Sequence, residues 1–90
     1  MSRAFVKEGG DWGNPLRRFN LPPRDDPGFD AAAAEALLDA AREGDTASAE
    51  LATGYYWGER RLAPHVERLL GRAREQGDAR LVELAERFLR

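Results

Sequence analysis

The feature that most constrains this chain is a sixteen-residue stretch that occurs twice. Residues 37–52 read LLDAAREGDTASAELA, and residues 69–85 read LLGRAREQGDARLVELA. Ten of the sixteen positions recur when Gln76 is treated as an insertion, at an offset of 32 and then 33 residues. Each copy places paired leucines before a Gly-Asp dipeptide, in which glycine can close one helix and aspartate can cap the next. The repeat therefore predicts an all-α fold of two helix-turn-helix hairpins.

The first and third of about four expected helices are set by apolar spacing. Residues 30–43 and 64–76 each carry apolar side chains at i, i+3, i+4 and i+7. Asp30 is the expected cap of the first helix, because its carboxylate can accept hydrogen bonds from the free amides of the first turn. Pro64 suits the first turn of the third helix, where the amide that it lacks would have no helical partner.

The second and fourth helices follow the two Gly-Asp dipeptides. The second is expected to begin after Asp45, to weaken at Gly54 and to end at Gly58, and the fourth is expected over residues 78–89. The predicted core consists of Leu37, Leu38, Ala41, Leu51, Tyr55, Val66, Leu69, Leu70, Ala73, Leu81, Leu84, Ala85 and Phe88.

Residues 1–30 differ in composition from the rest of the chain. They contain four of the five prolines and four of the nine glycines, and they show no sustained apolar period. Such composition favours an extended path. We therefore expect an extended N-terminal arm over residues 1–30 and a four-helix domain over residues 31–90. Either the arm packs over the helices and adds burial that sixty residues alone would lack, or it orders on a partner.

The composition argues against several classes of protein. Ninety residues form at most one domain and bury a limited fraction of their surface. The absence of cysteine removes disulfides, thiolate chemistry and sulfur-ligated metals. No apolar run approaches the length of a membrane span, so we expect a soluble cytoplasmic protein without a membrane partner. The net charge of −2 gives no general attraction to nucleic acid.

No constellation of residues indicates catalysis, a metal or a cofactor. His65 is the only histidine, and a surface or capping role suits it. Asp25, Asp26 and Asp30 cluster near a Pro-Gly turn but lack the regular ligand alternation of a calcium loop. The serines and threonines have no paired base at a recognisable spacing. We therefore expect a protein that is not an enzyme, with no catalytic residues, no metal site and no cofactor.

Two segments share an aromatic and basic pattern. Residues 12–19 read WGNPLRRF and residues 55–62 read YYWGERRL, so each places Trp-Gly before an arginine pair and a large apolar residue. Trp, Tyr and Arg most often dominate protein interfaces, and they can also stack on nucleic-acid bases while Arg meets phosphate. A further interpretation is that the aromatic rings pack on the helices and close the space between the hairpins. The predicted partner-binding residues are Trp12, Arg17, Arg18, Tyr56, Trp57, Arg60 and Arg61.

The hairpin sequence Leu-Leu-x-x-Ala-Arg-Glu-Gly-Asp is similar to the helical hairpin of ankyrin repeats, whose period is about 33 residues. The TPLH-type helix opening of that family is absent, and GERRLAP at residues 58–64 takes the place of its β-turn finger. Two copies are also fewer than the roughly three that a stable array needs. An ordinary four-helix domain built from two similar hairpins is the preferred interpretation.

Residues 2–8, SRAFVKE, resemble the N-terminal segment of some Gre-like transcription elongation factors. The long acidic-tipped coiled coil and the FKBP-like domain of those factors have no counterpart here, so the resemblance implies no cleavage activity and no catalytic residue. It implies a shared docking segment, with the transcription machinery as the partner. We expect a small non-catalytic protein-interaction module with an unknown protein partner. The alternative is a transcription-associated or nucleic-acid-binding accessory protein.

Overall fold

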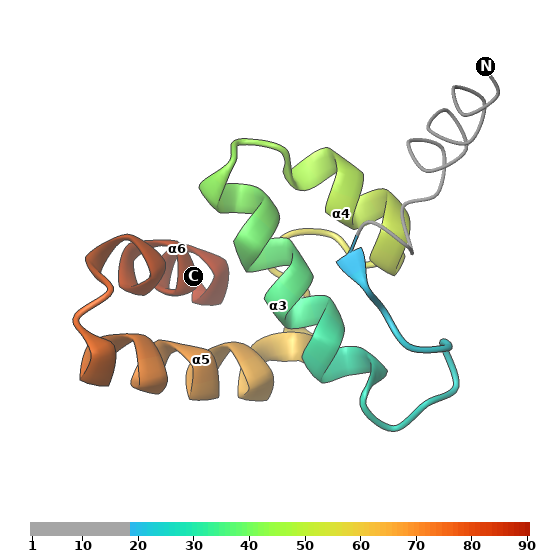
Figure 1. Ribbon diagram of the computed structural model, residues 1–90, viewed down its shortest axis with the longest axis horizontal. Helices are drawn as coiled ribbons and strands as arrows, with labels where there is room; N and C mark the ends of the chain where they lie inside the picture. Colours follow the sequence, from blue (N-terminus) through green and yellow to red (C-terminus); the bar gives the residue numbers. More distant parts are fainter. Residues whose placement is uncertain (1–18) are drawn as a thin grey trace, which may run out of the picture.

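The computed structural model describes residues 19–90, which form four α-helices and one short 3₁₀ helix and contain no strand. The helices are α3 (Phe29–Arg42), α4 (Thr46–Thr53), η1 (Arg60–Leu62), α5 (Ala63–Gln76) and α6 (Ala79–Leu89). Figure 1 shows α3 with α4 as one hairpin and α5 with α6 as a second, and α3 contacts both helices of the second hairpin. The predicted all-α fold of two hairpins is confirmed.

The turn between α3 and α4 has the chemistry that the Gly-Asp dipeptide predicts. Gly44 adopts a φ of 74°, and its amide donates to the carbonyl of Ala41 at 3.0 Å. The Asp45 amide reaches back to the carbonyl of Ala40 at 2.9 Å, which completes a Schellman motif. The Asp45 carboxylate then caps α4, because it accepts hydrogen bonds from the Ser48 amide at 3.3 Å and the Ser48 hydroxyl at 2.8 Å.

The turn between α5 and α6 repeats this geometry. Gly77 has a φ of 71° and donates to the carbonyl of Arg74 at 3.3 Å, while the Asp78 amide donates to the carbonyl of Ala73 at 2.9 Å. The Asp78 carboxylate accepts a hydrogen bond from the Leu81 amide at 3.1 Å and so caps α6. The repeated sequence therefore encodes a repeated turn, as predicted.

Arg42 connects the two turns. Its Nη1 atom lies 3.0 Å from Oδ2 of Asp78, so the last turn of α3 is paired with the cap of α6. The hydrogen bond from Arg42, followed by the one from the Leu81 amide, lowers the pKa of Asp78 below its ordinary value of 3.8. The carboxylate that caps α6 thus remains charged under mildly acidic conditions.

The start of α3 differs from the sequence prediction. Gly28 occupies the N-cap position without a side-chain hydrogen bond, so the prediction of Asp30 as the cap was wrong. Asp30 lies in the first turn, where its carboxylate accepts a hydrogen bond from the Tyr55 hydroxyl at 2.7 Å. The helix starts earlier because Phe29, which is only 3% exposed, is part of the buried cluster.

Helix α4 is shorter than predicted. It ends at Thr53, and Gly54 follows with a φ of 79° as its left-handed C-cap, so the expected continuation to Gly58 was wrong. Thr53 is fully buried; its hydroxyl donates to the Ala49 carbonyl at 2.8 Å and accepts from the Tyr55 amide at 3.1 Å. Because the Tyr55 amide donates to this side chain, it does not make the hydrogen bond that would continue the helix. The spacing of apolar residues in the sequence does not indicate such a bond.

The segment between the hairpins contributes to the core. Leu62, in η1, is fully buried, and η1 contacts α3. The Glu59 carboxylate caps this short helix by accepting from the Arg61 amide at 3.3 Å. Pro64 lies in the first turn of α5, as predicted.

Most of the predicted core is confirmed. The buried members are Leu37, Leu38, Val66, Leu69, Leu70, Ala73, Leu84, Ala85 and Phe88. Ala41, Tyr55 and Leu81 are partly buried and pack against this cluster. The prediction of Leu51 as a core residue was wrong, because α4 buries the small side chains of Ala49, Ala52 and Thr53 instead.

Three side chains in residues 19–28 contact the helices. Phe19 and Leu21 pack against the buried cluster. The Arg24 guanidinium lies 5.3 Å from the centroid of the Phe29 ring and donates to the Thr53 carbonyl at 3.0 Å. Phe19, Leu21 and Arg24 therefore attach this part of the expected arm to the helices, while residues 25–28 are exposed. The expected arm also includes residues 1–18, which lie outside the described residues, and the division at residue 30 stays a prediction.

Candidate functional site

The seven predicted partner-binding residues divide between two parts of the chain. Trp12, Arg17 and Arg18 lie outside the described residues, as do residues 2–8 with their resemblance to Gre-like factors. The other four belong to the segment that joins α4 to α5, where Trp57 is half-buried and Tyr56, Arg60 and Arg61 are exposed. These four side chains lie in four different environments.

Trp57 joins the two hairpins. Its ring meets the Phe88 ring edge-on, with centroids 4.8 Å apart and an interplanar angle of 69°. Its amide donates to the Glu50 carboxylate at 2.9 Å, which ties the segment back to α4. The packing of Trp57 agrees with the interpretation that aromatic rings close the space between the hairpins. Replacing Trp57 would therefore disturb the core as well as the surface.

Arg61 lies beside Tyr55. Its guanidinium carbon is 5.9 Å from the centroid of the Tyr55 ring, within the range of a cation–π contact. A hydrogen bond with Tyr55, followed by the charge of Glu59, raises the pKa of Arg61 above its usual range. Tyr55 is itself fixed by its hydrogen bond to Asp30. Arg61 therefore presents a permanent positive charge on an ordered aromatic support.

Arg60 lies elsewhere, beside the end of α6. Together with Gly58, Phe88 and Arg90 it lines an open hollow of about 360 Å³. Arg60 and Arg61 are adjacent in sequence, but Arg60 borders the hollow at the end of α6 whereas Arg61 lies over the Tyr55 ring. The two arginines therefore do not form a single site.

Tyr56 belongs to an exposed apolar surface on α4. The side chains of Tyr56 and Leu51 are each 77% exposed, and they are the exposed large hydrophobic residues within residues 19–90. With Ala47, Glu50 and Gly54 they line a shallow hollow of about 360 Å³. We call these five residues the Leu51–Tyr56 surface. Its single carboxylate, Glu50, accepts the hydrogen bond from the Trp57 amide.

Leu51 is the residue of this surface that the sequence prediction placed in the core. The signal for its true position was present, because Ala49, Ala52 and Thr53 follow i, i+3 and i+4 and mark the buried side of α4. Leu51 lies off that stripe. The prediction was wrong because it assigned the largest apolar side chain of α4 to the core, whereas the buried face of this helix consists only of small residues.

Other candidate chemistry in the described residues is local. Residues 19–90 contain no group of three or more His, Cys, Asp or Glu side chains placed to hold a metal ion. Nδ1 of His65 lies 3.4 Å from Nη1 of the exposed Arg68. The Asp26 carboxylate accepts a hydrogen bond from the Gly28 amide at 2.7 Å, as is common in turns. None of the helices over this range has both the length and the apolar character needed to cross a membrane.

Residues 19–90 thus form a small all-α domain of two helical hairpins. Within this range, the apolar side chains of the Leu51–Tyr56 surface, at the shortest α-helix, are exposed. Comparisons with protein-family models, with curated proteins and with solved structures found no match for the chain.

Proposed function

We propose that the chain is a small non-catalytic protein-binding module and that the Leu51–Tyr56 surface is its docking site. The observation that carries this proposal is the contrast between two equivalent leucines of the repeat. Leu84, in the second hairpin, is 4% exposed, whereas Leu51, at the matching position of the first, is 77% exposed. Tyr56 adds a second large exposed side chain beside it.

The repeat suggests what would cover Leu51. Leu84 is buried because α6 packs against both α5 and α3, so that Leu84 joins the same cluster as Leu37 and Leu38. Helical-hairpin units in general bury their apolar faces by packing against a neighbouring unit. A helix of a partner protein that packed on α4 would cover Leu51. In the second hairpin, α3 covers part of α6 in the same way. Tyr56 would provide an aromatic anchor of the kind that is common at interfaces.

The chemistry of the surface supports binding rather than catalysis. The hollow has one carboxylate, and Glu50 already accepts a hydrogen bond from the Trp57 amide. Apart from Tyr56 and Glu50, the described residues that line the hollow are Ala47, Leu51 and Gly54, whose side chains carry no polar group. A cytoplasmic location is part of the same proposal.

The alternative is a transcription-associated or nucleic-acid-binding role. It is favoured by the exposure of Tyr56 in the same segment as the exposed Arg60 and Arg61, because an aromatic ring can stack on a base while arginine meets phosphate. This alternative predicts binding to single-stranded nucleic acid that weakens steeply with salt. The resemblance of residues 2–8 to Gre-like factors suggests the transcription machinery as the setting for either role.

The proposed function is tested by changing the surface without changing the core. A tagged full-length chain carrying Leu51→Lys and Tyr56→Ser is compared with wild type in a pull-down with quantitative mass spectrometry. A Gln76→Lys, Ala79→Ser variant is the matched control, because both residues are exposed and it introduces the same lysine and serine. We expect at least one partner to be depleted about tenfold or more by the surface variant alone. Equal recovery of every partner by the two variants would remove the proposal.

A further inference from the structure

Helix α4 lies at one edge of the four-helix arrangement. It packs against α3, and Figure 1 shows α5 and α6 on the other side of α3. The outward side of α4 carries the Leu51–Tyr56 surface, so both exposed large hydrophobic side chains within residues 19–90 lie at this edge. Another molecule can therefore contact this surface while the four helices stay in place.

The repeat indicates what kind of element covers a leucine at this position. Leu84, the equivalent of Leu51, lies in the same buried cluster as Leu37 and Leu38 of α3. Helix α3 belongs to the first hairpin, which carries the other copy of the repeated sequence. Within the chain, a hairpin of the repeat thus covers a leucine of the repeat. A second copy of the chain would bring such a hairpin to Leu51.

The Leu51–Tyr56 surface is self-complementary in the sizes of its side chains. Leu51 lies near its middle, with the small Ala47 four residues before it and the large Tyr56 five residues after it. When two α4 helices pack antiparallel about a twofold axis near Leu51, Tyr56 of each copy lies over Ala47 of the other. A large ring then meets a small side chain at both ends of the contact.

One acidic and one basic side chain lie beside this surface. Glu50 lines the hollow, and the hydrogen bond from the Trp57 amide uses one of its two carboxylate oxygens, Oε2, at 2.9 Å. Arg24 lies at the carboxyl end of α4, where it donates to the Thr53 carbonyl at 3.0 Å. Its guanidinium also lies against Gly54, which lines the hollow. The two charges are therefore separated along the helix.

The antiparallel arrangement pairs these charges. Glu50 lies three residues after Ala47, and Thr53, which holds Arg24, lies three residues before Tyr56. The register that places Tyr56 over Ala47 therefore also brings Glu50 of each copy toward Arg24 of the other. A carboxylate and a guanidinium can form two parallel hydrogen bonds, and the twofold axis generates this pair twice.

We propose that a second copy of this chain docks on the Leu51–Tyr56 surface, with the two α4 helices antiparallel. This inference rests on the proposed docking function and names the partner of the same site. The complementarity of size and the complementarity of charge both support one register. Because the contact is centred on one short helix, the dimer is expected to be weak and reversible.

Sedimentation velocity of the full-length chain at about 0.15 M salt tests the proposal. We expect the sedimentation coefficient of wild type to rise from the monomer value towards the dimer value in a concentration series up to about 1 mM. The Leu51→Lys, Tyr56→Ser variant should associate about tenfold more weakly or less. The Gln76→Lys, Ala79→Ser control should associate as wild type does. A circular dichroism melt of each variant checks that the fold is retained.

Charge reversal tests the antiparallel register. Glu50→Lys and Arg24→Glu each bring like charges together twice in a dimer, so each variant alone should associate about tenfold more weakly than wild type. In an equimolar mixture, each dimer with one copy of each variant again places opposite charges together at both ends. The mixture should therefore recover association to within about threefold of wild type.

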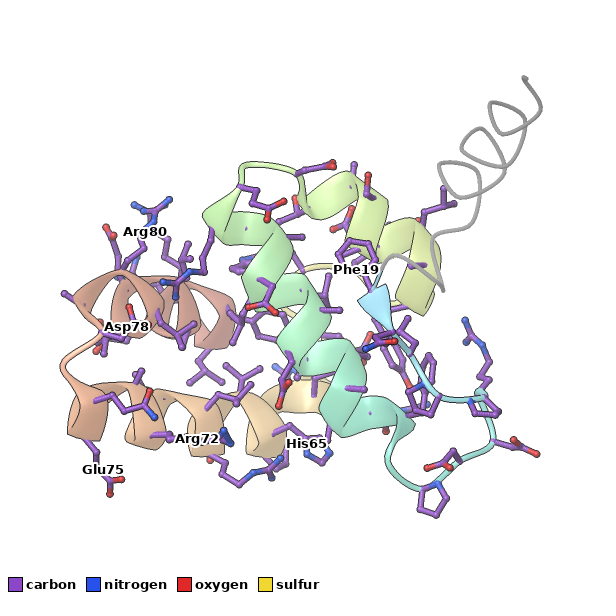
Figure 2. All side chains as sticks on the ribbon, in the orientation of Figure 1. Phe19, His65, Arg72, Glu75, Asp78 and Arg80 are labelled. Atoms are coloured by element: carbon purple, nitrogen blue, oxygen red, sulfur yellow. The ribbon has the colours of Figure 1, made fainter. Side chains whose placement is uncertain are left out.

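Arg72→Glu and Glu75→Lys are the matched controls for charge reversal. Both residues are exposed, and Figure 2 shows them on α5, in the second hairpin. They change the net charge of the chain by the same amounts as Arg24→Glu and Glu50→Lys. Each control variant should associate as wild type does, both alone and in the mixture.

Three outcomes would overturn this inference. If wild type stays monomeric throughout the series, a second copy is not the partner, and the pull-down described above still decides whether another protein docks. If the Leu51→Lys, Tyr56→Ser variant associates as wild type does, the dimer forms through a different surface. If the mixed charge variants associate no better than either variant alone, the antiparallel register is wrong.

Discussion

At the scale of single residues, Leu51 and Leu84 show that one sequence position can have two roles. The repeat makes them equivalent, yet Leu84 is 4% exposed and Leu51 is 77% exposed. The hydrophobic contribution of a side chain is roughly proportional to the apolar area that folding removes from water. Leu84 therefore contributes to stability, while Leu51 is left available for contact with another molecule.

Alanine substitution at these two leucines should have very different effects on stability. We expect Leu84→Ala to lower the free energy of unfolding by about 2–5 kcal/mol, because it leaves a cavity in the core. Leu51→Ala should change it by less than about 0.5 kcal/mol. Urea unfolding followed by circular dichroism measures both. Comparable losses for the two variants would mean that Leu51 is buried in solution.

Asp78 should give the second hairpin a defined response to acid. Because the pKa of Asp78 is lowered in the folded chain, its stabilising effect is fully present above the ordinary value of 3.8 and is lost as the pH falls through the lowered value. We therefore expect wild type to exceed Asp78→Asn in urea midpoint at neutral pH and this difference to disappear in strong acid. A difference that persists unchanged in strong acid would show that the charge of Asp78 is not responsible.

At the scale of elements, the turns could be predicted from sequence and the end of α4 could not. The Gly-Asp turns depend on residues within one or two positions of each other, so the dipeptide is sufficient to indicate them. The end of α4 depends on the buried hydroxyl of Thr53 and on Arg24, which donates to the Thr53 carbonyl from 29 residues away. Leu62 is buried in a segment too short to show a helical period. Such contacts between distant segments leave no local pattern.

Two glycines should respond in opposite directions to alanine. Gly54 has a φ of 79°, and an added Cβ would also collide with the Arg24 guanidinium, so Gly54→Ala should destabilise the chain by about 1–2 kcal/mol. Gly71 lies inside α5 with no atom within 4 Å of an added Cβ, so Gly71→Ala should stabilise it by about 0.5–1 kcal/mol. Thermal unfolding of both variants is the measurement. Stabilisation by Gly54→Ala would contradict the assigned end of α4.

At the scale of the whole molecule, α3 is the helix around which the others pack. It contacts α4, η1, α5 and α6, and it buries Phe29, Ala33, Ala34, Ala36, Leu37, Leu38 and Ala40. Four of these are alanines, whose small side chains let neighbouring helices approach closely from several directions. The apolar period in the sequence identified one face of α3, but the identity of its neighbours is set by tertiary packing.

In the candidate site, too, the sequence could not show which side chains are covered by tertiary packing. The aromatic and basic sequence pattern indicated Tyr56, Arg60 and Arg61, and all three are exposed. It also singled out Trp57, which packs on Phe88, and it placed Leu51 in the core. Residue type indicated which side chains suit an interface, whereas only the arrangement of the helices separates those that are covered from those that are not.

The central claim, that Tyr56 lies at a protein-docking surface, is tested most directly by photo-crosslinking in cells. A photoreactive phenylalanine analogue replaces Tyr56 in one full-length variant and Gln76, which is exposed on the second hairpin, in another. The account predicts a discrete protein adduct from the position of Tyr56 that is absent from the position of Gln76. No adduct at Tyr56, or the same adducts at both positions, would contradict it.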